Sequence, residues 1–83
     1  MKLSEDLLKK LNKQYEASAT VPFRYRNNDI VVRTDKEGNA VQAFIGRAGE
    51  DGTIRGDRYS RNMIRDREGK LIKDFWERKG KAS

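Results

Sequence analysis

The sequence predicts an α+β domain in which an N-terminal helix packs on an antiparallel β-meander of four to five strands, curled toward a small barrel. Two observations predict this fold. Apolar residues recur at helical spacing near the start of the chain. Further on, the pattern Asp-x-Glu-Gly occurs at 35–38 and at 66–69, each time between two apolar segments. Because Asp favours a chain reversal and Gly accepts a positive φ, each copy predicts a β-hairpin.

Residues 1–83 are expected to form a single small domain, because this length lies near the lower limit for independent folding. Leu, Ile, Val and Phe make up 17 of the 83 residues, a proportion at which disorder competes with folding. Since these apolar residues are grouped along the chain, we expect a folded domain with a thin core. The alternative is a chain that becomes ordered only on a partner.

A helix is predicted over residues 3–16. Ser4 is a suitable N-cap, and acidic residues follow in the first turn, where the helix dipole favours negative charge. So short a helix is marginal alone in water, so its apolar stripe is expected to cover a sheet of the same chain. A partner helix in a homodimer and a membrane surface are the alternatives. The stripe consists of Leu7, Leu8, Leu11 and Tyr15.

The β-rich region is expected over residues 23–78. Pro22 and the alternation of aromatic and Arg side chains at 23–26 predict an edge strand, because Pro cannot donate to a β-ladder. An apolar strand is expected at 30–34. The segment 41–48 fits a helix or a strand, and the turn before it favours the strand. A long, exposed strand is expected to end at Arg65, with a bulge at Gly56.

The last apolar segment is also ambiguous. Leu71, Ile72, Phe75 and Trp76 fit one face of a helix, whereas a strand would carry apolar side chains on both faces. By analogy with the first hairpin we predict a strand, and the alternative is a C-terminal helix over 71–78. Residues 80–83 are expected to be a frayed tail.

Composition argues against several classes of function. The chain has no Cys and no His, which removes thiolate nucleophiles, the usual zinc ligands and the imidazole acid–base group. The carboxylates near the turns lack the spacing of a calcium loop, and no glycine-rich phosphate loop is present. We therefore expect that the protein is not an enzyme and that it binds no cofactor and no metal. The first residues carry too much charge for a signal peptide, so a cytoplasmic protein without membrane association is expected.

Positive charge is distributed unevenly along the chain, whose net charge is +6. Residues 1–52 carry nine Lys and Arg against eight Asp and Glu, whereas residues 53–83 carry ten against five. An acidic partner is therefore expected to meet the second half first.

Arg and Tyr residues are interleaved in two similar segments, 24–27 and 58–62. Cations neutralise phosphates and aromatic rings stack on bases, so this combination predicts a module that binds RNA or single-stranded DNA through an Arg/Tyr face. The alternative is a solvated strand face whose Arg side chains pair with neighbouring carboxylates. Either duplication of a two-strand unit or independent use of common hairpin residues explains the similarity. The candidate residues are Arg24, Tyr25, Arg26, Arg55, Arg58, Tyr59, Arg61 and Arg65.

A second hypothesis is a protein–protein interaction module. Its partner would be acidic, or would make an apolar contact around Phe75 and Trp76. The alternative role of Trp76, the sole Trp of the chain, is to close the core. A monomer is expected.

Overall fold

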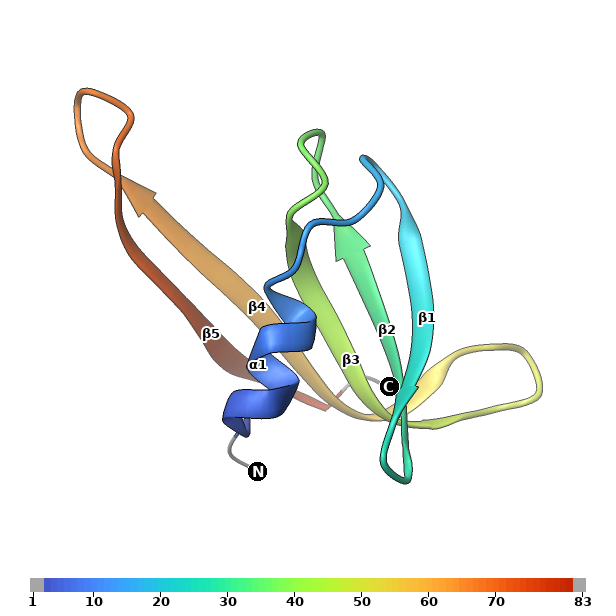
Figure 1. Cartoon of the computed structure of the whole chain (residues 1–83). Coiled ribbons are helices and arrows are strands. Elements are labelled where there is room, and N and C mark those ends of the chain that lie inside the picture. Colours follow the sequence, from blue (N-terminus) through green and yellow to red (C-terminus); the bar gives the residue numbers. More distant parts are fainter. Residues whose placement is uncertain (1–2, 82–83) are drawn as a thin grey trace.

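The computed structural model describes residues 3–81, which contain one helix and five strands (Figure 1). Each strand pairs antiparallel with the next, so the sheet order follows the chain order from β1 to β5. The α+β class, the antiparallel meander and the strand at the last apolar segment are therefore confirmed. The elements are α1 (Glu5–Leu11), β1 (Thr20–Tyr25), β2 (Asn28–Thr34), β3 (Ala40–Ala48), β4 (Ile54–Arg65) and β5 (Leu71–Lys81).

The sheet is open, so the predicted curling into a barrel is wrong. Within the described residues, β1 and β5 are the outer strands and do not pair with each other. β3 pairs with β4 only as far as Ser60, and the rest of β4 pairs with β5 alone. The β4–β5 hairpin therefore projects beyond the other strands (Figure 1), and the molecule measures 45 × 25 × 22 Å.

The two Asp-x-Glu-Gly turns have the same structure, and both predicted hairpins are confirmed. Oδ1 of Asp35 and Oδ1 of Asp66 each accept 2.9 Å hydrogen bonds from the backbone amides two and four residues further on. The glycines that complete the turns, Gly38 and Gly69, have φ angles of 84° and 85°. The Asp side chain of each motif thus organises the reversal by accepting hydrogen bonds from the backbone that follows it.

The helix is shorter than the predicted 3–16. Ser4 caps it as expected, since its Oγ accepts a 3.2 Å hydrogen bond from the Leu7 amide. It ends at Leu11 because the next residues bond to the β2–β3 turn and do not continue the helix. The Tyr15 amide donates to the Gly38 carbonyl oxygen over 2.9 Å, and Gln14 forms a bridge to the same turn.

The core lies between α1 and one face of the sheet, which we call the helix face. Leu7 and Leu11 of α1 are 2% and 0% exposed. They belong to one apolar cluster with side chains of the three central strands. The buried sheet members of this cluster are Ile30, Val32, Ala40, Ala43, Ile45 and Tyr59. The opposite face carries no helix, and we call it the bare face (Figure 1).

Two local predictions differ from the structure. Gly56 is not a bulge: it lies directly opposite Gly46, and a Cβ on either glycine would overlap backbone atoms of the other strand. The two glycines thus permit a close approach of β3 and β4. The prediction of a frayed tail is also wrong for residues 80–81, because β5 continues to Lys81; the rest of the predicted tail, residues 82–83, lies outside the described part of the chain.

The two equivalent turn glycines, Gly38 and Gly69, provide a test of whether the segment after α1 packs against the β2–β3 turn. We expect Gly69→Ala to lower the free energy of unfolding by about 1–2 kcal/mol, because Ala is strained at positive φ. Gly38→Ala should cost about 1–3 kcal/mol more, because its Cβ would also meet the Tyr15 carbonyl group. Urea unfolding of both variants gives this comparison. Equal losses would show that the Tyr15 backbone does not lie against the turn.

Candidate nucleic-acid interface

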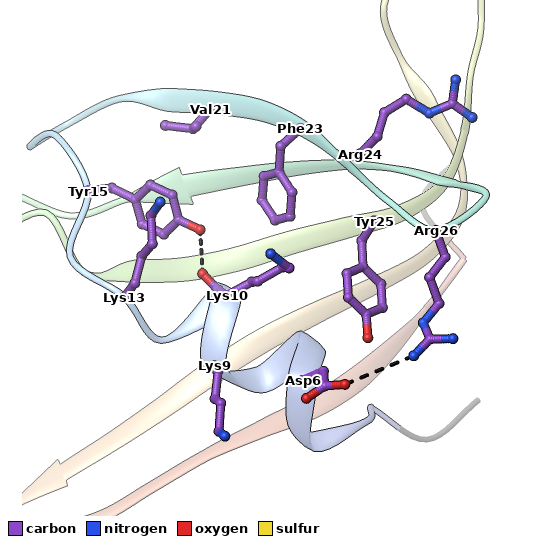
Figure 2. A pocket seen from close by; sticks show the side chains of 10 residues that line it. All are labelled: Asp6, Lys9, Lys10, Lys13, Tyr15, Val21, Phe23, Arg24, Tyr25 and Arg26. Carbon is purple, nitrogen blue, oxygen red and sulfur yellow. Dashed lines mark hydrogen bonds and ion pairs between the residues drawn. The ribbon is translucent and has the colours of Figure 1, made fainter.

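A groove of about 830 Å³ lies between α1 and the edge strand β1 (Figure 2). β1 has a neighbouring strand on one side only, so its side chains on the helix face are not enclosed by a further strand. α1 forms the opposite wall. The groove is lined by Asp6, Lys9, Lys10, Lys13, Tyr15, Val21, Phe23, Arg24, Tyr25 and Arg26.

Three aromatic rings form a row along this groove. The alternation of β1 directs Phe23 and Tyr25 to the same face, and Tyr15 joins them from the segment after α1 (Figure 2). All three residues are half-buried and pack against the core cluster. The Tyr15 hydroxyl donates to the Lys10 carbonyl oxygen, and the Tyr25 hydroxyl lies 3.4 Å from Ser4 Oγ. The two tyrosines are thus held by the helix before any ligand binds.

Exposed cations stand beside the aromatic row. The Nζ of Lys13 lies 5.3 Å from the centre of the Tyr15 ring, and the Arg26 guanidinium lies 5.4 Å from the Tyr25 ring. Asp6 is the one acidic side chain among the lining residues, and it stands 4.0 Å from Arg26. Three lysines and Arg26 therefore share the groove with a single carboxylate, so the groove is an electropositive site.

Ion pairing leaves the lysines of the groove uncompensated. Among the residues that the structure describes, no carboxylate forms an ion pair with Lys9, Lys10 or Lys13. Arg24 points away from the rings (Figure 2) and pairs with Asp29 on the bare face over 3.4 Å.

Tyr25 and Tyr15 titrate differently. The hydrogen bond with Ser4, together with the Arg26 guanidinium, lowers the pKa of Tyr25. Burial raises the pKa of Tyr15. Tyr25 is therefore the ring whose hydroxyl is coupled to a neighbouring cation, and an anionic ligand on Arg26 would act on both groups.

The second predicted segment lies elsewhere. Tyr59 is 3% exposed and belongs to the core. The side chain of Arg61 is 7% exposed and makes a bidentate pair with Asp74 at 2.7 and 2.5 Å. Arg58 alternates with Tyr59 and so lies on the bare face, where it faces Phe44 of β3. None of residues 58–62 lines the groove that residues 24–26 line.

The two remaining candidates lie at opposite ends of β4. Arg55 is exposed beside the β3–β4 turn. Arg65 donates to the Gly69 carbonyl oxygen over 3.2 Å at the far tip of the last hairpin. Of the eight candidates, only Arg24, Tyr25 and Arg26 line the groove.

Seven of the ten groove residues were not among the candidates predicted from the sequence. The available signal was the spacing of Lys9, Lys10 and Lys13, which lie on one flank of the apolar stripe that includes Tyr15. Phe23 carried no charge signal of its own. Both features belong to the first half of the chain, whose charges nearly balance. The prediction from net charge therefore favoured the second half.

Within the described chain, intramolecular ion pairs engage three of the ten Lys and Arg residues of the second half. Asp74 pairs with Arg61, and Asp57 pairs with Arg78 at 2.7 Å. Lys79 pairs with the neighbouring Glu77. The groove, by contrast, is formed by cations of the first half of the chain.

Phe75 and Trp76 point to opposite faces of β5. Phe75 is 44% exposed. Ile64 of β4 and the first two residues of β5 are also exposed. Trp76 is half-buried against the core cluster, and its Nε1 donates a 2.9 Å hydrogen bond to Asn12 Oδ1. The two side chains thus alternate across the sheet, although both residues line a hollow that also includes Leu8 and Asn12.

Residues 3–81 also lack two other kinds of site or segment. No group of three or more acidic side chains is placed to hold a metal ion. No helix in this range is long and apolar enough to cross a membrane.

The Arg61–Asp74 pair predicts a specific acid sensitivity. The hydrogen bond from Arg61 holds the pKa of Asp74 below its ordinary value. The pair therefore contributes its full stability above the unfolded-state pKa of about 3.9, and loses it as the pH falls through the lower folded-state pKa. We expect the difference in free energy of unfolding between wild type and Asp74→Asn to shrink as the pH falls through this range. Urea unfolding at a series of pH values measures it; a constant difference would contradict the assignment.

Comparison of the chain with protein-family models, with curated proteins and with solved structures found no match.

Proposed function

We propose that this protein is a non-enzymatic module that binds single-stranded RNA or DNA in the groove between α1 and β1. The observation that carries the proposal is the row of three half-buried rings beside exposed cations (Figure 2). Such a row offers stacking surfaces for successive unpaired bases, while Lys and Arg side chains neutralise the phosphates. The proposed site is smaller than the Arg/Tyr face predicted from the sequence. Of that face, the proposed site retains residues 24–26.

The geometry favours unpaired bases over a duplex. The rings line a groove, and the two tyrosines are held there by hydrogen bonds to the helix and its cap. Bases that are already stacked in a helix would not reach them, whereas extruded or single-stranded bases can. Phosphate contacts carry no sequence information, so the module is proposed to bind with little sequence preference.

The proposal requires α1 to remain packed on the helix face, because the helix supplies one wall and the lysines. Leu7 and Leu11 hold it there through the core cluster. The tie between Tyr15 and the Lys10 carbonyl oxygen fixes the end of the helix against the aromatic row. As part of the same proposal, the protein acts in the cytoplasm, where RNA is the abundant ligand of this class.

Binding of a labelled mixed-sequence oligonucleotide, followed by fluorescence anisotropy at several salt concentrations, tests the function. Lys10→Ala and Lys13→Ala should each reduce the slope of log Kd against log salt by about 0.7, the value for one phosphate contact on a single strand. Tyr25→Leu should weaken binding by about 5- to 150-fold with an unchanged slope, because it removes a stacking surface and no charge.

Lys36→Ala is the matched control, since Lys36 is an exposed lysine of the β2–β3 turn outside the groove. Its binding should equal that of the wild type. If Lys36→Ala weakened oligonucleotide binding as much as Lys10→Ala, binding would be explained by diffuse charge attraction and not by the groove. Absence of binding at low salt would refute the proposal.

Leu11→Ala tests the role of the helix. Because Leu11 is fully buried, we expect a loss of about 2–5 kcal/mol in the free energy of unfolding. Under conditions where the variant remains folded, oligonucleotide affinity should also fall, since the wall of the groove loosens. Circular dichroism and anisotropy on the same samples give both quantities. Unchanged stability would show that α1 does not depend on the core.

A further inference from the structure

The outer edge of β5 is the second unusual surface of the molecule. β5 has 11 residues and pairs with β4 on one side, while no strand of the described chain lies on its other side. The large exposed apolar residues of the described chain all belong to the hairpin that β5 forms with β4. They are Ile64, Leu71, Ile72 and Phe75, with exposures of 40–57%. An unpaired, partly apolar edge is a template for a further strand.

The other edge of the sheet is protected. β1 has only six residues, and Pro22 within it removes a backbone donor. β5 contains no Pro. The molecule therefore has one edge that accepts another strand and one that resists it.

We propose that β5 pairs antiparallel with β5 of a second copy of this chain, joining two sheets into one of ten strands. This surface is independent of the groove and of nucleic-acid binding. It departs from the monomer expected from the sequence. The interaction is isologous, so it closes at two copies and does not extend into a filament.

Symmetry restricts how two such strands can align. Antiparallel pairing of identical strands places a two-fold axis perpendicular to the sheet, and residues that face each other lie on the same side. A residue of β5 can therefore face only a residue an even number of positions away from itself. The β4–β5 register shows that Ile72 and Lys79 are extra residues opposite β4, which leaves 73–78 as the regular part of the strand.

Charge selects one of the allowed alignments. With Phe75 facing its own copy on the axis, Lys73 faces Glu77, and this opposite-charge pair occurs twice. Moving the axis to residue 74 would place Asp74 against its own copy. Moving it to residue 76 would place Lys73 against Lys79. Within the regular segment, only the alignment centred on Phe75 faces opposite charges that take no part in the ion pairs between β4 and β5. With the axis at residue 76, Asp74 would face Arg78, and these two side chains already pair with Arg61 and Asp57.

The groups required for this alignment are available. Lys73 and Glu77 lie on the bare face with Phe75, because they alternate with Trp76, which packs toward the core. Lys73 takes part in no ion pair within the described chain. Glu77 pairs only with its neighbour Lys79, and both side chains are at least 40% exposed. The Arg61–Asp74 pair is left intact, since Asp74 faces Trp76 across the new contact.

A charge-reversal cycle tests the alignment by sedimentation equilibrium. Lys73→Glu and Glu77→Lys should each raise the dimer Kd about tenfold or more, because each places like charges opposite each other twice. The double variant Lys73→Glu/Glu77→Lys should restore the wild-type Kd. Glu50→Lys, a charge reversal in the exposed β3–β4 turn, is the control and should leave the Kd unchanged.

Cross-linking tests the axis directly, because the natural chain contains no Cys. Phe75→Cys should form a disulfide between copies on mild oxidation, since facing Cα atoms of an antiparallel pair lie about 4.5–5.5 Å apart. Lys73→Cys is the matched control: its two copies would be offset by four residues, about 13 Å, and should not cross-link efficiently.

Three results would overturn the proposal. They are a monomer at all concentrations up to about 1 mM, equal cross-linking at positions 73 and 75, and failure of the double charge reversal to restore association. Circular dichroism of each variant establishes that the fold is retained. The salt dependence of oligonucleotide binding by Lys73→Glu provides a separate readout, so failure of dimerisation and failure of nucleic-acid binding remain distinguishable.

Discussion

One helix of seven residues provides the apolar cover for a five-stranded sheet, and this limited cover determines where the rest of the structure is exposed. Leu7 and Leu11 reach the three central strands, where the buried residues lie. β1 at one side and the outer part of the β4–β5 hairpin at the other receive less cover. A thin core thus leaves two accessible regions on opposite sides of the molecule, a groove and a strand edge.

The two regions differ in chemistry because the chain distributes its carboxylates unequally in space. On the β4–β5 hairpin, Asp57 and Asp74 form ion pairs with Arg78 and Arg61. At α1, the acidic residues of the first turn lie where the helix dipole favours negative charge. Within the described chain they form no ion pair with the lysines that follow. Net charge along the sequence therefore does not show which cations are paired, since Coulomb pairing depends on distance in the fold.

Local signals in the sequence predicted local structure well. The Asp-x-Glu-Gly turns, the Ser4 cap, and the strands at 41–48 and 71–78 follow from residues that are close in the chain. The end of α1 does not, because it depends on a hydrogen bond between Tyr15 and Gly38. The separation of residues 24–26 from 58–62 also depends on the whole sheet: alternation decides which side chain points to the core, and a neighbouring strand decides which cation is neutralised.

The proposed dimer would relate the two regions to each other. A two-fold axis perpendicular to the sheet keeps its faces, so both α1 helices would lie on the same side of the ten-stranded sheet. Each groove borders β1, at the edge farthest from β5, so the two sites would stand at opposite ends of that side. A nucleic acid long enough to reach both would bind the second site intramolecularly, at an effective concentration set by its length and stiffness. Dimerisation would then increase affinity for long single strands without changing any contact within a groove.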